Sequence, residues 1–206
     1  MKGIYSRVLS LIILLSGCGG TIQSAGLISS GREALFANNN QAALGYFEEA
    51  AQTDPNAIYG STLQMGVFSY LGQAQYLTGN YAQAQETLEK ALSMHPADHI
   101  ALLYLGLTKA RLGNREAGLI DIENGMKGIA AFIVYIQNAF RFSIGYYWDP
   151  EGQIQASIKT DLAMISSGNI DWAQLIADGG RLGTRVEYEE LLARQQQQRQ
   201  REMRMP

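Results

Sequence analysis

The sequence has little proline, a single cysteine and no long apolar run, and each shortage narrows the possible folds. Among 206 residues there are 4 prolines and 1 cysteine, Cys18, so no intrachain disulfide can form. Scarce proline, together with frequent alanine, leucine and glutamine, favours helices, and no stretch predicts a convincing strand. The apolar run from Val8 to Leu15 is far shorter than the roughly 20 residues that span a bilayer. We therefore expect an all-α fold without disulfides.

The residue types that metal binding and catalysis need are also scarce. The two histidines, His95 and His99, are four residues apart, but Pro96 between them predicts a helix boundary, so they would not share a helical face. The sequence contains no phosphate-binding loop, dinucleotide fingerprint or nucleophile elbow. We accordingly predict no catalytic residue, no metal site, no cofactor and no enzyme activity.

The stretch from Phe68 to Pro96 predicts two antiparallel helices. Small and apolar residues recur at three- and four-residue spacing on one face of each helix, and Gly79-Asn80 marks the turn between them. At the closest crossing we expect Gly72 to face Ala84, with Leu88 filling the space beside them. The residues of this pattern are Phe68, Leu71, Gly72, Ala84, Leu88, Ala91 and Pro96.

This pattern resembles the tetratricopeptide repeat, although Gln75 stands where that family usually has a second aromatic residue. Leu105-Gly106 follows Leu71-Gly72 after 34 residues (106 − 72), which is the period of the family. A first unit has the same internal spacing, with its pattern at Gly31, Ala43, Phe47, Ala50 and Pro55. It lies seven residues out of phase, so residues 57–63 should lengthen a helix or add a turn. The resemblance implies an all-α, tetratricopeptide-like array of helical hairpins, about three units, that serves as a binding scaffold.

The N-terminus predicts a lipoprotein signal. Lys2 and Arg7 precede the apolar run, and Leu15-Ser16-Gly17-Cys18 resembles the bacterial lipobox. That resemblance implies cleavage before Cys18, its lipidation, including palmitate, and anchoring to the periplasmic face of the outer membrane. An ordinary signal peptide with an incidental cysteine is the alternative. Removing residues 1–17 would make the formal charge of −3 more acidic, which argues against a nucleic-acid partner.

The chain then divides into five segments. We predict a signal peptide over residues 1–17, a tether over 18–28 and the repeats over 29–128. C-terminal capping helices should follow over 129–193, in which Gly179, Gly180 and Gly183 are candidates to kink the last helix. The Gln/Arg-rich tail, residues 194–206, lacks an apolar stripe and is predicted to be frayed or disordered.

In tetratricopeptide arrays the first helix of each unit lines the concave side. Carried onto this chain, the resemblance implies a largely apolar partner-binding groove that suits an amphipathic helix or an extended segment. The alternative is that the chain's own C-terminal helices fill this groove and its residues are core. The implied groove residues are Ser69, Gln73, Tyr76, Leu77, Leu103, Leu107 and Arg111.

Aromatic residues are concentrated between Phe132 and Trp148. One interpretation is a helix that packs on the last repeat as a cap. The other is that Tyr146, Tyr147 and Trp148 remain partly exposed as a patch for contact with a partner.

These patterns lead to one functional prediction, a lipid-anchored periplasmic adaptor that mediates protein–protein interaction in the cell envelope. Its partner would be another envelope protein or a peptide segment of one. A structural subunit or pilotin-like lipoprotein of an outer-membrane assembly or secretion system is the alternative, and a cell-wall enzyme is a distant third. A cluster of titratable groups in a deep pocket would favour the enzyme, whereas an open groove would favour the adaptor.

Overall fold

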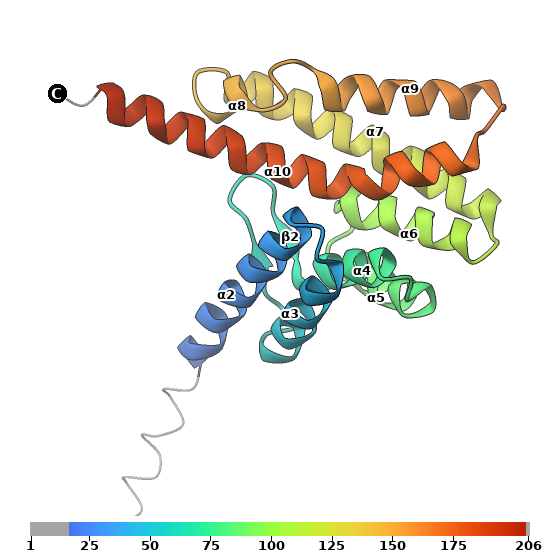
Figure 1. Ribbon diagram of the computed structural model, residues 1–206, viewed down its shortest axis with the longest axis horizontal. Helices are drawn as coiled ribbons and strands as arrows, with labels where there is room; N and C mark the ends of the chain where they lie inside the picture. Colours follow the sequence, from blue (N-terminus) through green and yellow to red (C-terminus); the bar gives the residue numbers. More distant parts are fainter. Residues whose placement is uncertain (1–16, 205–206) are drawn as a thin grey trace, which may run out of the picture.

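The computed structural model describes residues 17–204, which form nine helices and two strands of two residues each (Figure 1). The predicted all-α fold is confirmed. In chain order the elements are α2 (Gly17–Phe36), α3 (Asn40–Thr53), β1 (Ile58–Tyr59), β2 (Met65–Gly66), α4 (Val67–Leu77), α5 (Tyr81–Met94), α6 (His99–Arg111), α7 (Arg115–Ala139), α8 (Ile144–Tyr147), α9 (Gln153–Ser167) and α10 (Trp172–Arg204).

Three helical hairpins, α2–α3, α4–α5 and α6–α7, are joined by turns of the same kind. Each turn contains one residue with positive φ, namely Asn38 (56°), Gly79 (83°) and Gly113 (97°). In the middle turn, Gly79 N–H donates to Tyr76 O and Asn80 N–H donates to Gln75 O, and the other two turns repeat these bonds. This is the Schellman arrangement, in which a left-handed residue lets the helix end and the chain reverse.

The hairpins cross closely where the sequence has glycine. A Cβ built on Gly31 would lie 2.4 Å from the Phe47 ring, and one on Gly72 would lie 2.5 Å from Leu88. The third crossing is tighter, because a Cβ on Gly106 would lie 2.5 Å from the backbone nitrogen of Ile122 and 2.6 Å from Gly118 O. The large residue of the second helix therefore lies against the glycine of the first in each hairpin.

The seven extra residues before α4 form neither a longer helix nor a helical turn. Residues 57–66 fold back as a loop in which β1 and β2 pair antiparallel, with Ile58 opposite Gly66 and Tyr59 opposite Met65. Gly60, with φ of 101°, sits at the bend, where a Cβ would meet the backbone oxygen of Leu63 at 1.9 Å. This loop leaves the array and reaches α10.

The predicted segment boundaries need three corrections. The predicted tether, residues 18–28, is helical throughout because it lies within α2, and Ile28 is fully buried. No break separates repeats from cap at residue 129, because α7 runs through this point as one helix of 25 residues. The predicted disordered tail is helical as far as Arg204, because it prolongs α10. Of the predicted signal, residues 1–16 lie outside the part of the chain that the structure describes.

The second half of α7 supports the remaining helices. Phe132 packs edge-on against Trp148, with ring centroids 5.7 Å apart, and Trp148 is fully buried. The next residue, Asp149, accepts hydrogen bonds from the backbone of Ile154 (3.0 Å) and Gln155 (3.1 Å), which fixes the start of α9. From the end of α9 the chain turns into α10, which runs back across the hairpins (Figure 1).

Candidate functional site

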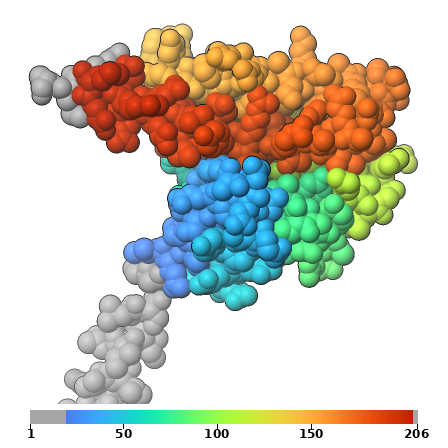
Figure 2. Space-filling model, viewed as in Figure 1, coloured from blue at the N-terminus to red at the C-terminus, as the bar shows by residue number. Residues whose placement is uncertain are grey.

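The central part of the implied groove, at Gln73, Tyr76 and Leu107, is covered by α10. Ser69, Gln73, Leu103 and Leu107 have no exposed surface, and Tyr76 is 5% exposed. Leu77 is half-buried and only Arg111 is exposed. The prediction of an open groove is therefore wrong for most of these residues, and the alternative, a groove filled by a C-terminal helix, describes the structure. Figure 2 shows α10, in orange and red, lying across the blue N-terminal helix α2.

Three glycines allow α10 to approach the array closely. A Cβ built on Gly179 would lie 3.0 Å from Leu107, and one on Gly180 would lie 3.5 Å from the Tyr76 ring. At Gly183 the space is smallest, because a Cβ there would lie 2.6 Å from the Tyr104 ring. The sequence suggested that these glycines could kink or interrupt the last helix, but α10 is continuous through them. They form its contact face with α4 and α6.

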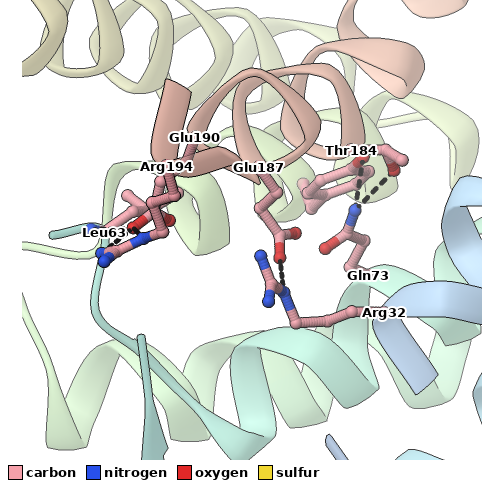
Figure 3. Close-up of polar contacts among 8 residues, drawn as sticks. Arg32, Leu63, Gln73, Thr184, Glu187, Glu190 and Arg194 are labelled. Carbon is pink, nitrogen blue, oxygen red and sulfur yellow. Dashed lines mark hydrogen bonds and ion pairs between the residues drawn. The ribbon is translucent and has the colours of Figure 1, made fainter. Parts of the chain in front are cut away.

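Polar side chains join α10 to the array at the centre of this contact (Figure 3). Gln73 Nε2 donates to Thr184 Oγ1 at 3.0 Å and to the Tyr104 hydroxyl at 3.2 Å. The Tyr104 hydroxyl in turn donates to the backbone oxygen of Gly180 at 2.9 Å. Buried polar atoms are costly without partners, so these bonds fix both the depth and the register of α10.

A buried ion pair lies beside these hydrogen bonds (Figure 3). Arg32 Nε on α2 is 2.7 Å from Glu187 Oε2 on α10, and their side chains are 13% and 1% exposed. Burial raises the pKa of Glu187 to about 7, Arg32 opposes this rise, and Glu190 adds to it. The second oxygen, Oε1, has no hydrogen-bond partner among the described residues. The pair therefore selects one position of α10 but carries a desolvation cost.

The loop before α4 makes a third polar contact. Glu190 Oε1 accepts from Arg194 Nη2 at 2.6 Å and from Leu63 N–H at 3.5 Å. Arg194 also donates to the hydroxyls of Ser61 and Thr62. The extra residues between the first two hairpins thus contact α10 through hydrogen bonds to Glu190 and Arg194.

These contacts have the character of a helix-binding surface. The apolar walls of α4 and α6 accept small residues of the bound helix, and hydrogen bonds and an ion pair set its orientation. Only Gln73 of the polar residues just described belonged to the predicted groove. Arg32, Glu187 and Glu190 were missed because their partners are 155 and 127 residues away in the chain, and no periodic pattern connects them.

A separate cleft of about 240 Å³ lies between the loop, the start of α6 and α7. Two titratable side chains, Asp98 and His99, line it. Asp98 accepts from Ala101 N–H (2.9 Å) and from the Ser69 hydroxyl (2.5 Å), so it serves as the cap of α6. Among the described residues no group of three or more histidine, cysteine, aspartate or glutamate side chains is placed to hold a metal.

The predicted aromatic patch is only partly exposed. Tyr146 is 69% exposed and Tyr147 is half-buried, but Trp148 is fully buried against Phe132, so its inclusion in the patch is wrong. Phe142, which the prediction left out, is 89% exposed. Trp148 therefore belongs to the packed part of this stretch, and a contact role for Tyr146 and Tyr147 stays a prediction.

The side chain of Cys18 lies outside the described residues, so lipidation stays a prediction. No helix in the described range 17–204 is long and apolar enough to cross a membrane. A scan against protein-family models finds no match for this chain, and a search of curated proteins finds no similar sequence.

Proposed function

We propose that the protein is a lipid-anchored, tetratricopeptide-like adaptor of the cell envelope that recognises an amphipathic helix of a partner protein. The observation that carries this proposal is the concave face of the array, which holds a helix, α10, through apolar contacts with α4 and α6 and through the Gln73–Thr184 hydrogen bond. A surface that binds a helix of its own chain has the chemistry to bind a similar helix of another.

The repeat pattern supports the tetratricopeptide part of the proposal. The turn glycines Gly79 and Gly113 are 34 residues apart (113 − 79), as are Gly72 and Gly106 at the crossings. The anchor is supported by the residues around Cys18. In living cells Cys18→Ala should abolish acyl labelling and release the protein from the membrane fraction. An acylated product from this variant would refute the lipoprotein assignment.

The helix-binding role is tested by opening the groove. Gly183→Leu in the full chain should push α10 off Tyr104, because even a Cβ would lie 2.6 Å from that ring. A fluorescent peptide with the sequence of residues 172–194 should then bind the variant and raise its own anisotropy. The unmodified protein, whose groove is filled, should not bind it at the same concentration.

A scrambled peptide of the same composition is the control, and circular dichroism reports whether the variant keeps its helices. If the folded variant does not bind the native peptide, or binds the scrambled one equally well, the groove is not a helix-binding site. Partner segments found by crosslinking in cells can then be compared with the native peptide as competitors.

A further inference from the structure

The end of the molecule formed by α7, α8 and the last turns of α10 exposes an unusual number of aromatic rings. Phe142 is 89% exposed, Tyr146 69%, Tyr135 60% and Phe140 43%. Tyr135 and Phe140 contact each other edge-on at 6.5 Å between ring centroids. Elsewhere in the described chain Tyr70, Tyr104 and Phe47 are buried, and the exposed rings, Tyr46 (40%) and Tyr188 (45%), are less exposed than Tyr135, Phe142 and Tyr146.

Arginine side chains lie near the exposed rings. Arg141 lies over the Phe142 ring, with 4.6 Å from its guanidinium carbon to the ring centroid. An open cleft of about 520 Å³ separates these two residues from α10, and its lining includes Tyr146, Tyr147 and Gln200. Arg199 and Arg201 flank Gln200 and are exposed, and Met203 is 70% exposed.

The charge of this end is opposite to that of the whole chain. The formal net charge is −3, yet the segment 195–206, which follows the Arg194–Glu190 ion pair, has three arginines against one glutamate, Glu202. Arg141, which lines the same cleft as Gln200 of α10, adds a further positive charge at this end. Such a local excess attracts an anionic surface, whereas the acidic remainder of the protein is repelled by it.

We propose that this end, comprising Tyr135, Phe140, Arg141, Phe142, Tyr146, Arg199, Arg201 and Met203, is a membrane-contact surface that binds anionic lipid headgroups. Tyrosine and phenylalanine rings insert at the boundary between headgroups and acyl chains, and arginine pairs with lipid phosphates. The most exposed ring, Phe142, projects from the surface. A projecting ring suits insertion into lipid better than the packed, concave centre of a protein interface.

This contact is independent of the groove and of lipidation at Cys18, and it would orient the body against a bilayer. The test uses the full chain with Cys18→Ser, so that an introduced cysteine is the single thiol. Phe142→Cys carries a polarity-sensitive fluorophore, and Tyr146→Cys provides a second labelled position in case the first substitution disturbs α8. Leu112→Cys is the matched control, because Leu112 is also exposed beside an arginine, Arg111, at another site.

Vesicles of phosphatidylglycerol should shift the emission of the label at residue 142 to shorter wavelength, and vesicles of phosphatidylcholine should not. The label at 112 should be unaffected by either, which separates contact at this surface from any tethering through the N-terminus. The double variant Arg199→Gln, Arg201→Gln should need about tenfold more phosphatidylglycerol vesicles to give the same emission shift. Removing the same charge at Arg115 and Arg181, which are exposed elsewhere, should leave this amount unchanged.

Three results would overturn the proposal. One is the absence of a shift at both 142 and 146. Another is an equal shift with neutral and anionic vesicles, or at 112. The third is a response to an acidic peptide without any response to vesicles, which would assign the surface to a protein partner.

Discussion

The crossings within the hairpins and the contact between the hairpins and α10 are both close, but they are built differently. Within a hairpin, a glycine such as Gly106 meets a residue 12 to 16 positions later, Gly118 or Ile122, and the ion pair beside this crossing, Lys109–Asp121, is partly exposed. The α10 contact combines glycines with buried hydrogen bonds and the Arg32–Glu187 ion pair. The glycine crossings fix the fold of the hairpins, and the polar contacts determine which helix packs against them.

The largest effect is expected from leaving Glu187 without its partner. Arg32→Met keeps the length of the side chain but removes the charge, so a carboxylate that is 1% exposed loses its counter-ion. We expect a loss of up to about 3–5 kcal/mol in the free energy of unfolding, measured by urea denaturation at pH 9, well above the pKa of about 7 that Glu187 has beside Arg32. Arg181→Met is the control, because Arg181 is 70% exposed in its pair with Asp178 and such pairs contribute about 0–1 kcal/mol. Equal losses in the two variants would mean that α10 is not held by a buried pair.

The crossings are tested by adding one methyl group. In Gly106→Ala the new Cβ would lie 2.5 Å from the backbone of Ile122, which cannot move aside as a side chain can. We expect a loss of about 3 kcal/mol in thermal or urea unfolding. Gly45→Ala on α3, where a Cβ would meet nothing within 4 Å, should instead stabilise by about 0.5–1 kcal/mol. If both changes have the same sign, the close crossing is not present.

The smallest effect is the share of the pH dependence that Glu187 contributes, beside Asp161, whose pKa is raised to about 6 by burial and by Asp178. The pKa of Glu187 is about 7 in the folded state against its ordinary value of 4.5, so the folded protein binds more protons between these values. Its contribution to stability therefore rises as the pH falls from 7 towards 4.5, by at most about 3 kcal/mol. Glu187→Gln should reduce the slope of melting temperature against pH over this range, and Asp161 should account for part of the slope that is left. An unchanged slope in the variant would assign the dependence to other groups.

The same contrast explains what could be predicted from the sequence. The hairpins, their glycine crossings and the 34-residue spacing follow from residues close together in the chain, where periodicity and turn chemistry are readable. The sequence correctly placed Tyr76 and Leu107 on the first helices of the second and third hairpins. The same apolar stripe, however, is expected whether these residues line an open groove or belong to the core. Only the path of α10 decides between these, and that path depends on Glu187, Glu190 and Thr184, whose partners are more than 100 residues away.

Two errors have the same origin. The segment after Arg194 lacks an apolar stripe and was predicted to be disordered, yet it continues a helix whose earlier turns are held by the array. Trp148 was grouped with Tyr146 by sequence proximity, although the buried ring of Trp148 packs on Phe132 of α7. In both cases a non-local contact overrides what the local sequence indicates.

The central claim, that α10 occupies the concave face, is tested most directly by the reactivity of a thiol placed beneath it. In the full chain with Cys18→Ser, Gln73→Cys puts the thiol at a position with no exposed surface, and Gln83→Cys puts it at an exposed position on α5. The account predicts that a thiol reagent modifies residue 83 rapidly and residue 73 at least a hundredfold more slowly, and that adding Gly183→Leu makes residue 73 reactive. Equal rates at 73 and 83 in the otherwise unchanged protein would show that the groove is open and would contradict the account.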